Sequence, residues 1–231
     1  MSGTLYVVAT PIGNLGDFSL RAVETLKKAD LIACEDTRHA NILLTHYGID
    51  RPLTSFFEGN EAAKAKSIAE RIERGENVAL ISDAGTPNIS DPGFRLVEQC
   101  VRLRLPIVSV PGPSALVAAL SISGLPTHAF IFEGFLPPKS GARRKKMASW
   151  KDEERTVIFY ESPYRVVKTL KDLSEALGNV RVVVAREITK KFEEVLRAPV
   201  DELAAHFEKG EPRGEFVILL NLGYGQEPPK K

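Results

Sequence analysis

The sequence ISDAGTPNISDPG, residues 81–93, directly follows the strand-like run ENVAL at 76–80. Glycine, proline and aspartate recur along it, so it is too kinked to form a helix. Such residues are typical of the connection between a strand and a helix in an α/β domain, where the chain must reverse. The stretch therefore predicts a buried strand that ends in a tight loop. It also raises the question why that loop carries small and acidic groups.

The segments on either side of this stretch alternate between apolar strands and helices. Helices are predicted at 20–29, 38–48 and 61–75, the last with charges spaced for one solvated face and Gly75 as its stop. The strands are near-continuously apolar, as expected when helices cover both faces of a parallel sheet. They are expected at 5–10, 31–35, 53–57, 77–82 and 106–111.

The second half of the chain has a different pattern. The runs at 180–187 and 193–199 lie too close in sequence for a helical crossover, so we expect an antiparallel pair of strands. The fold class is therefore α/β, with two α/β domains, the first with a mainly parallel sheet and the second with a mixed sheet. The expected divisions are an N-terminal α/β domain at 1–114, a C-terminal α/β domain at 115–223 and a polar tail at 224–231.

Charge and cysteine content restrict the class of protein. Lys and Arg number 31 against 30 Asp and Glu, and the net charge of +1 argues against a surface that coats nucleic acid uniformly. Cys34 and Cys100 form no CxxC motif, which suits a reducing compartment better than a disulfide framework. The N-terminal run is unlike a signal peptide, and no apolar stretch approaches the roughly 18 residues of a membrane helix. We therefore expect a cytoplasmic protein.

The common enzyme motifs do not occur in this sequence. The loop ATPIGNLGD at 9–17 lacks both the glycine spacing of GxGxxG and the GK[ST] of a P-loop. The 4 histidines are scattered without HExxH spacing, so no metal site is expected. No GxSxG nucleophile elbow is found either. Ordinary nucleotide enzymes, zinc enzymes and serine hydrolases are therefore disfavoured.

Loops rich in glycine, proline and polar residues follow most of the predicted strands. Ligands of open α/β sheets bind just outside the carboxyl ends of the strands, so a series of such loops predicts an enzyme. The loops lie at 9–17, 34–41, 81–93, 110–115, 132–141, 160–165 and 186–191.

These loops carry the motifs of a known family in the same order and spacing. They include ATPIGNLGD at 9–17, EDTR at 35–38, SDAGTP at 82–87, FEGFLPPKSGARR at 132–144, FYESPYR at 159–165 and AREITKKFEEV at 185–195. From about Leu5 to Leu222 the sequence resembles the bacterial 16S ribosomal RNA (cytidine-2′-O)-methyltransferases, a branch of the tetrapyrrole methylase superfamily. The resemblance implies a class III methyltransferase with S-adenosyl-L-methionine as cofactor. It also implies a homodimer, with the 16S rRNA of the small ribosomal subunit as partner.

The resemblance explains why the loop at 81–93 is small and acidic, because the matching loop of the family wraps the cofactor. Small residues let backbone N–H and C=O groups approach a ligand that bulky side chains would block. Asp83 or Asp91 faces the cationic part of the cofactor or, equally, caps the helix near Phe94. Ser114 has the alternative role of a simple N-cap. The implied cofactor-binding residues are Pro11, Asp83, Gly85, Thr86, Pro87, Ile89, Ser90, Asp91, Pro113, Ser114 and Ala115.

A ribose 2′-hydroxyl is a poor nucleophile at neutral pH, so a positioned base or a nearby cation is expected to assist methyl transfer. The first catalytic candidate is Glu187, because its surroundings resemble a family motif. Glu161 and Lys190 are the other main candidates, and Glu35 and Asp36 of EDTR are also considered. Each of these residues has the alternative of a structural ion pair.

The run KSGARRKK at 139–146 is interpreted as an arm that contacts RNA phosphates, with a solvated helix start as the alternative. RNA affinity concentrated in such a patch is expected to fall steeply with salt. Phe135, Tyr160 and Tyr164 either stack on an exposed base or belong to the apolar core. The expected RNA-binding residues are Arg38, Lys139, Arg143, Arg144, Lys145, Arg165 and Arg186.

Two features depart from the family pattern. FFEGNE at 56–61 stands where members usually have a histidine-bearing, HEHNE-like run, and many members continue beyond FVILLNL with a further helical segment. Two alternative functions stay open on the sequence alone. One is methylation of a corrin or precorrin tetrapyrrole, against which the basic run and EDTR weigh. The other is a non-catalytic RNA-binding relative.

Overall fold

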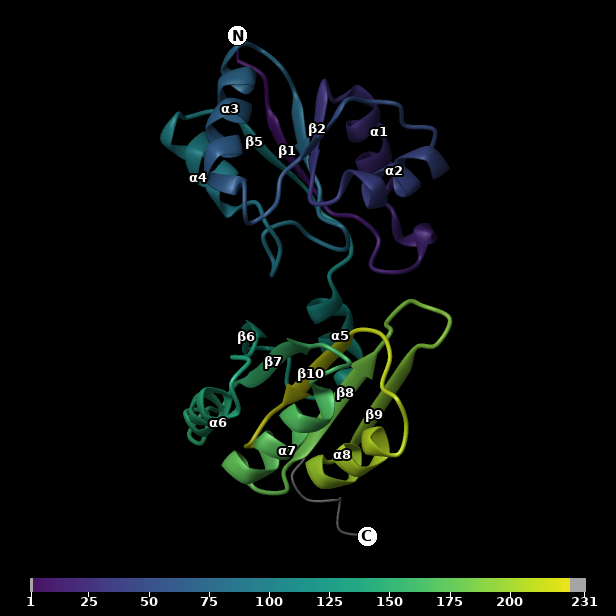
Figure 1. Cartoon of the computed structure of the whole chain (residues 1–231), viewed down its shortest axis with the longest axis vertical. Helices are drawn as coiled ribbons and strands as arrows, with labels where there is room; N and C mark the ends of the chain where they lie inside the picture. The colour runs from purple at the N-terminus through teal and green to yellow at the C-terminus, as the bar shows by residue number, and fades with distance from the viewer. Residues whose placement is uncertain (1, 225–231) are drawn as a thin grey trace. The chain divides into compact units, whose positions relative to one another are not determined.

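The structure, a computed structural model, describes residues 2–224, and the chain folds into two compact units, Met1–Ser114 and Ala115–Lys231. Each unit is built on a five-stranded sheet with helices, which confirms the predicted class of two α/β domains (Figure 1). Apart from Tyr224, the predicted polar tail at 224–231 lies outside the described residues. None of the described helices is long and apolar enough to cross a membrane.

The sheet of the first unit is entirely parallel. Its strand order is β3-β2-β4-β1-β5, and each neighbouring pair runs in the same direction. The strands are the predicted apolar runs, and each ends where the polar loop after it begins. They are β1 (Leu5–Val8), β2 (Leu31–Cys34), β3 (Leu53–Ser55), β4 (Val78–Leu80) and β5 (Ile107–Val110).

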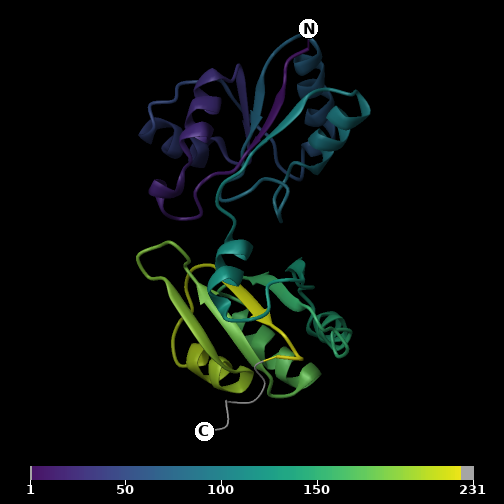
Figure 2. The ribbon, with the colours of Figure 1, turned by 180° about the vertical axis from the view of Figure 1, so that it is seen from behind.

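Helices cover both faces of this sheet (Figures 1 and 2). On one face Leu26 and Leu44 pack with Ile32, and on the other face Ile68 and Leu96 pack against the opposite side of the strands. The helices are α1 (Leu20–Lys28), α2 (Thr37–His46), α3 (Glu61–Glu73) and α4 (Phe94–Arg102), and the short 3-10 turn η1 (Leu15–Asp17) precedes α1. Helices α1 and α2 thus cover one face of the sheet, and α3 and α4 cover the other.

At the carboxyl end of β4, the loops that follow neighbouring strands leave the sheet over opposite faces. The chain leaves β1 and β2 over the face of α1 and α2, whereas it leaves β4 over the opposite face, towards α4. Because β4 lies between β2 and β1 in the sheet, its loop diverges from the loops of both neighbours. Ligands of open α/β sheets bind where neighbouring connections diverge in this way. The topology therefore favours a ligand site at the loop 81–93.

Both cysteines lie in the cores of the first unit, where Cys34 and Cys100 are fully buried. Burial, with smaller effects from the charges of Asp83 and Asp36, raises the pKa of Cys34 to about 12. Burial alone raises the pKa of Cys100 to about 11. The thiolate is the reactive form, so we expect neither thiol to react with an aromatic disulfide reagent at about pH 8 until the protein unfolds. Thiol titration with and without urea measures this, and rapid labelling of the native protein would contradict it.

The sheet of the second unit is mixed. In its order β6-β7-β10-β8-β9, the pair β6 and β7 is parallel and the other neighbouring pairs are antiparallel. The antiparallel pairing of β8 with β9 confirms the prediction made from their short separation. The strands are β6 (Phe130–Phe135), β7 (Thr156–Glu161), β8 (Arg181–Arg186), β9 (Glu194–Pro199) and β10 (Phe216–Leu220).

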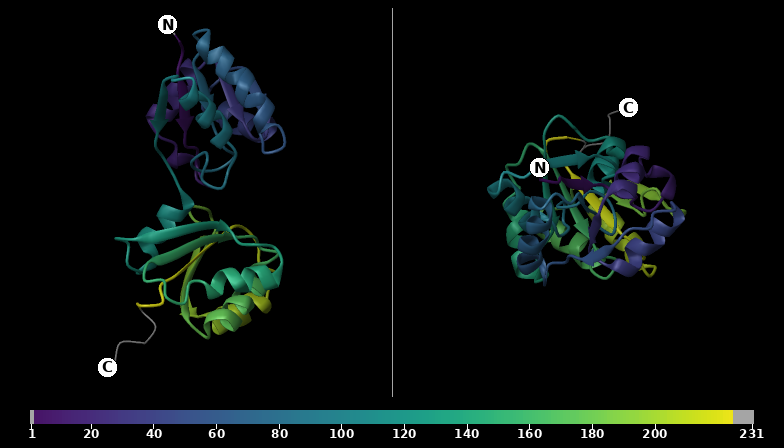
Figure 3. Two further views of the ribbon diagram at one scale, coloured as in Figure 1. Left: turned by 90° about the vertical axis from the view of Figure 1, so that its left-hand side faces the viewer. Right: turned by 90° about the horizontal axis from the view of Figure 1, so that it is seen from above.

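Helices also lie on both faces of the second sheet (Figure 3). One face carries α5 (Ala115–Ser123), and the other carries α7 (Val166–Leu177) and α8 (Val200–Glu208), with α6 (Ser140–Ala148) beside α7. Because β10 runs opposite to both β7 and β8, the loops that follow β6, β7 and β8 leave the sheet at one edge. The predicted site residues of this unit lie mostly in or beside these three loops.

Candidate active site

Three loops of the first unit are joined at the carboxyl ends of their strands. Thr10, after β1, and Gly85, after β4, each donate a backbone hydrogen bond to the other's carbonyl oxygen, at 2.9 and 3.1 Å. Thr86 Oγ1 donates to the carbonyl oxygen of Pro113, after β5, at 3.0 Å. We call Thr10, Gly85, Thr86 and Pro113 the three-loop junction. It joins three predicted cofactor residues, Gly85, Thr86 and Pro113, to Thr10, the chain neighbour of the predicted Pro11.

Gly85 lies at the tightest point of the three-loop junction. Its φ of +86° is in the left-handed region that favours glycine. A Cβ atom at this position would lie 3.3 Å from Cγ2 of Ile12 and 3.7 Å from the carbonyl oxygen of Pro113. Glycine therefore supplies both the backbone conformation and the space that the junction requires.

The rest of the loop 81–93 is strained. Asn88 and Ser90 have φ values of +73° and +66°, which non-glycine residues adopt rarely and often at ligand sites. Oδ1 of Asn88 is buried without a hydrogen-bond partner. Ile89 and Ser90 are exposed, so this part of the loop is accessible to a ligand. Asn88 does not stand out in the sequence, because asparagine is also an ordinary turn residue.

Asp83 connects this loop to the start of α2. Its Oδ1 accepts a hydrogen bond from the backbone N–H of Asp36 at 3.3 Å. Two backbone N–H groups at the start of α4, those of Gly93 and Arg95, instead donate to Oε1 of Glu61 at 3.0 and 2.9 Å. The alternative that Asp83 caps this helix is therefore wrong, because a residue of α3 performs that role.

An acidic cluster formed by Glu35, Asp36 and Asp83 lies at the end of β2. Burial, and then the charges of Asp83 and Asp36, raises the pKa of Glu35. Hydrogen bonds from the side chain and the backbone N–H of Arg38 lower the pKa of Asp36. The Arg38 side chain is exposed but lies 2.7 Å from Asp36, so this predicted RNA contact is already part of an ion pair. Among residues 2–224, no group of His, Cys, Asp and Glu side chains is arranged to hold a metal ion.

The other predicted cofactor residues belong to the same loops. Leu116, in the first turn of α5, donates its backbone N–H to the hydroxyl oxygen of Tyr160 at 3.1 Å, which fixes the start of that helix against β7. Ala115 begins α5 and the second unit. The remaining residues are Pro11 and Pro87, which are buried, and Asp91, Pro113 and Ser114, which are partly buried.

Glu187 and Lys190 form an ion pair in the loop after β8. Oε1 of Glu187 accepts hydrogen bonds from Nζ of Lys190 at 2.8 Å and from the backbone N–H of Glu215 at 3.1 Å. Nζ of Lys190 also donates to Oε2 of Glu215 at 2.8 Å. A Cβ atom at Gly214 would lie 2.3 Å from Oε1 of Glu187, so glycine is needed to accommodate this carboxylate. Gly214 and Glu215 do not stand out in the sequence as site residues, because they precede β10 instead of following a strand.

The loop after β8 is strained in the same way as the loop 81–93. Glu187 has a φ of +52° and Thr189 a φ of +68°, which is unusual for a β-branched residue. Oγ1 of Thr189 is buried without a hydrogen-bond partner. Backbone strain and an unused buried polar atom both concentrate at functional sites. These observations support Glu187 and Lys190 as functional residues.

The environment keeps both members of this pair charged. Burial acts to raise the pKa of Glu187, but hydrogen bonds from Lys190 and from the Glu215 backbone outweigh it, and the pKa is lowered. Burial acts to lower the pKa of Lys190, but its hydrogen bonds to Glu187 and Glu215 outweigh it, and the pKa is raised. At neutral pH Glu187 is therefore a carboxylate able to accept a hydrogen bond. Lys190 remains an ammonium group and does not act as a base.

Glu161 is a structural residue, and its predicted catalytic role is wrong. It is 2% exposed at the end of β7. Its two oxygens accept hydrogen bonds from the backbone N–H of Ser162 at 2.8 Å, from Nη2 of Arg165 at 3.0 Å and from Oγ1 of Thr169 at 2.6 Å. A carboxylate enclosed by these partners is not accessible to a substrate.

Two of the predicted RNA contacts are directed into the second unit. Arg143 is 3% exposed, and its Nε donates to Oδ2 of Asp172 at 2.8 Å. Its predicted role as a phosphate contact is wrong, because its guanidinium is buried. Arg165 is partly exposed, but its Nη2 donates to Glu161 and to the carbonyl oxygen of Leu136 at 2.8 Å.

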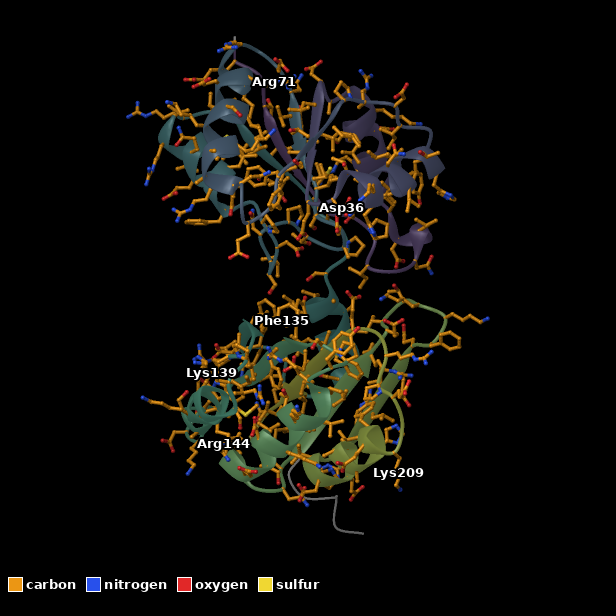
Figure 4. All side chains as sticks on the ribbon, viewed as in Figure 1. Asp36, Arg71, Phe135, Lys139, Arg144 and Lys209 are labelled. Atoms are coloured by element: carbon orange, nitrogen blue, oxygen red, sulfur yellow. The ribbon has the colours of Figure 1, made fainter. Side chains whose placement is uncertain are left out.

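The remaining basic residues lie at the surface except Arg186, which is partly buried, and some of them form ion pairs. Lys139, Arg144 and Lys145 are exposed, and Figure 4 shows Lys139 and Arg144 on the α6 side of the second unit. Arg144 forms an ion pair with Glu175 of α7. Arg186 Nε lies 3.3 Å from Oε2 of Glu194. The run at 139–146 is therefore a helix with part of its charge neutralised, not a uniformly free basic arm.

Known proteins are similar to this chain over nearly its whole length. A family profile described as Tetrapyrrole (Corrin/Porphyrin) Methylases matches residues 4–204. The chain is 48% identical to the "Ribosomal RNA small subunit methyltransferase I" of Thermotoga maritima, over 95% of this chain and 98% of that protein. It is 47% identical to the protein of the same name in Escherichia coli O157:H7, over 97% of this chain and 80% of that protein. The chain thus spans nearly the whole of the first relative and about four fifths of the second.

Solved structures with low sequence identity share the fold. A cobalt precorrin-4 methyltransferase has a TM-score of 0.68 at 18% identity, and the match covers 94% of both chains. A diphthine synthase has a TM-score of 0.74 at 12% identity, over 95% of this chain and 90% of that one. At these identities the likeness establishes the two-domain architecture alone.

Proposed function

Because the chain belongs to the tetrapyrrole methylase family, we propose that it methylates the ribose 2′-hydroxyl of a cytidine in the 16S rRNA of the small ribosomal subunit. The chain is an S-adenosylmethionine-dependent class III methyltransferase. The observation that carries the proposed substrate is the near-half identity, over almost the entire chain, to proteins named as small-subunit rRNA methyltransferases. The cytidine and the 2′-oxygen rest on the motifs ATPIGNLGD, EDTR and SDAGTP.

The three-loop junction of the first unit fits the cofactor. S-adenosylmethionine supplies an electrophilic methyl group, and its adenosine and amino-acid parts offer many hydrogen-bonding atoms. Gly85 keeps the centre of the junction free of a side chain, and the exposed Ile89 is linked to it because its backbone N–H donates to the carbonyl oxygen of Thr86 at 3.3 Å. We propose that these residues hold the cofactor, together with Thr86 and the acidic Asp83.

Gly85→Val is expected to lower the affinity for S-adenosylmethionine by about 10- to 100-fold, because a β-branched residue at this φ strains the junction by roughly 1–3 kcal/mol. Isothermal titration calorimetry measures the affinity. Gly210→Val is the matched control, since a Cβ atom at Gly210 meets nothing within 4 Å. An unchanged dissociation constant in Gly85→Val would remove this loop from the cofactor site.

The catalytic contribution of the chain is proposed to come from Glu187 and Lys190. As the 2′-oxygen gains a methyl group, its hydroxyl proton must leave. The Glu187 carboxylate is ionised, and we propose that it accepts a hydrogen bond from the hydroxyl, orients the oxygen and receives the proton. Lys190 holds that carboxylate in place at 2.8 Å and leaves Oε2 of Glu187 for the substrate. Positioning of this kind supplies a large part of the acceleration in a displacement reaction.

The proposed substrate also bears on location and assembly. An enzyme that acts on ribosomal RNA works where ribosomal subunits are made, so we propose that this one acts in the cytoplasm. We further propose a homodimer, which sedimentation equilibrium tests directly.

The proposed function is tested by offering labelled methyl groups to competing acceptors. The acceptors are small ribosomal subunits from cells that lack this enzyme, naked 16S rRNA and a precorrin. We expect label in RNA, in at least one of the two RNA forms, and none in the tetrapyrrole. Label in the precorrin alone would replace this function with the tetrapyrrole alternative. No label in any acceptor, despite measurable cofactor binding, would favour the non-catalytic alternative.

A further inference from the structure

The loops that follow β6 and β7 are joined to each other in the second unit. The two strands are parallel neighbours, so the loops 136–139 and 162–165 leave the sheet at the same edge. Arg165, from the second loop, donates its Nη2 to the carbonyl oxygen of Leu136 in the first loop at 2.8 Å. One side chain therefore fixes the two loops relative to each other.

Three successive carbonyl groups of the first loop are held by two arginines. Arg165 holds Leu136, and Nη1 of Arg143 donates to the carbonyl oxygens of Pro137 and Pro138 at 3.3 and 3.1 Å. The two prolines have fixed φ angles and no N–H group, which restricts the loop further. We call the hydrogen bonds of Arg143 and Arg165 to residues 136–138 the arginine clamp.

Each arginine of the clamp is itself fixed by a buried acid. Arg165 is held by Glu161, which also accepts a hydrogen bond from Thr169 of α7. Arg143 is held by Asp172 of α7, which also accepts a hydrogen bond from Oγ of Ser140 at 2.7 Å. The arginine clamp is therefore anchored to α7 through buried side chains. Because the loop 136–138 is already ordered, less conformational entropy is lost when a ligand binds to it.

The clamped loops present two aromatic rings and a cation to solvent. Phe135, at the end of β6, is 57% exposed, and its ring makes an edge contact with Tyr160 at a centroid distance of 5.8 Å. Tyr164 of the second loop is 91% exposed. Lys139 is exposed at the end of the first loop, and Figure 4 shows Phe135 and Lys139 on the same side of the unit. Exposed rings and a cation on two joined loops suit unpaired nucleotides, which stack on aromatic faces and carry phosphate.

We infer that Phe135, Tyr164 and Lys139 form a preorganised surface for a single-stranded segment of the substrate RNA, with Arg165 and Arg143 as the positioning residues that hold it. This inference rests on the proposed function and identifies the part of the chain that contacts the RNA. It reassigns Arg143 and Arg165 from phosphate contacts to supports of the loop. Tyr160 supports the ring of Phe135 and, through its hydroxyl, the start of α5.

The stacking contacts are tested with Phe135→Ala and Tyr164→Ala, using small subunits from cells that lack this enzyme as substrate. We expect each change to raise KM for the subunit by about 5- to 100-fold, the range found when one stacking ring is removed. The kcat value and the affinity for S-adenosylmethionine stay within about twofold. Phe130→Ala is the matched control, because Phe130 lies at the other end of β6 and is 42% exposed.

The phosphate contact is tested by salt dependence. Lys139→Ala is expected to reduce the slope of log affinity against log salt by about 0.7, the value for one phosphate of a single strand. Lys209→Ala, a change at an exposed lysine after α8, leaves the slope unaltered. Phe135→Ala also leaves the slope unaltered, because it removes no charge.

The arginine clamp is tested with Arg165→Lys, which keeps the charge but cannot donate to both Glu161 and Leu136 in the same planar geometry. If Arg165 positions the loop, this variant raises KM for the subunit as Phe135→Ala does, and adding Phe135→Ala to it causes little further loss. If Arg165 contacts a phosphate directly, lysine substitutes for it and KM changes by less than about threefold. Fluorescence of Trp150, in the core of this unit, checks that the variants fold.

The inference is overturned if wild-type protein methylates the subunit while Phe135→Ala and Tyr164→Ala leave KM at the level of Phe130→Ala. The RNA then binds elsewhere on the chain, and the proposed function stands. If wild-type protein methylates no RNA, the proposed function is wrong, and the inference that depends on it is wrong as well. The two failures are distinguished by the wild-type reaction alone.

Discussion

Replacing Glu187 with glutamine is expected to lower the rate of methyl transfer to the small ribosomal subunit by about 100-fold or more, in the range of general-base contributions. The carboxylate has a lowered pKa and accepts hydrogen bonds from Lys190 and the Glu215 backbone, so it is ionised and held in place. The amide keeps the shape but loses the charge and an acceptor oxygen. Single-turnover kinetics with saturating cofactor measures the effect.

The pH profile provides a second readout of the same residue. Because the pKa of Glu187 lies below its ordinary value of 4.5, protonation of this group removes activity only at lower pH. Wild-type activity should therefore show no acidic limb from this group between about pH 6 and pH 8. An acidic limb in that range that disappears in Glu187→Gln would contradict the lowered pKa.

Glu215→Gln is the matched control for this prediction. Glu215 also contacts Nζ of Lys190 at 2.8 Å, but its side chain is 74% exposed and leaves the Glu187 contact in place. We expect it to lower the rate by less than about threefold, as is usual for an exposed ion pair. Equal losses in the two variants would show that Lys190, and not Glu187, is the essential group.

Arg143→Met is expected to destabilise the second unit by about 3–5 kcal/mol, because it leaves the carboxylate of Asp172 buried without its cation. Both side chains are less than a tenth exposed. Trp150 is the only tryptophan of the chain and lies in the core of the second unit. Its fluorescence during urea unfolding therefore reports on this unit separately from the first.

The neighbouring arginine is the control for this change. Arg144 pairs with Glu175, and both of these side chains are about half exposed. Arg144→Met should therefore cost no more than about 1 kcal/mol. The double change Arg143→Met with Asp172→Leu should recover most of the loss, since an apolar pair of similar volume often replaces a buried ion pair without penalty. A loss below about 1 kcal/mol in Arg143→Met alone would contradict a structural role for the pair.

The comparison of these two arginines shows what local sequence can and cannot predict. Arg143 and Arg144 are adjacent in one basic run, and neither composition nor charge distinguishes them. Successive residues of a helix point about 100° apart, so one of the two faces α7 while the other faces solvent. Which one is buried depends on Asp172, which lies 29 residues further along the chain. Glu161 resembled a catalytic carboxylate for the same reason, because the sequence does not show that Arg165 and Thr169 enclose it in the folded unit.

Elements governed by local pattern were predicted well. The helix expected at 61–75 is observed as Glu61–Glu73, and the strands expected at 180–187 and 193–199 form the antiparallel pair β8 and β9. The loop 81–93 directly follows the buried strand β4, as its turn residues predicted. The contacts that the sequence did not predict join segments that are far apart along the chain. Glu61 caps α4 from 32 residues away, and Glu187 meets Glu215 across 28 residues.

Nucleoside analysis decides whether the protein is a 2′-O-methyltransferase of cytidine in small-subunit RNA. Small subunits from cells that lack this enzyme are incubated with the protein and S-adenosylmethionine carrying a heavy methyl group, and the RNA is digested to nucleosides for mass spectrometry. We expect heavy 2′-O-methylcytidine, formed by wild-type protein and reduced by about 100-fold or more with Glu187→Gln. A heavy methyl group found on a base, or on the ribose of another nucleoside, would contradict it.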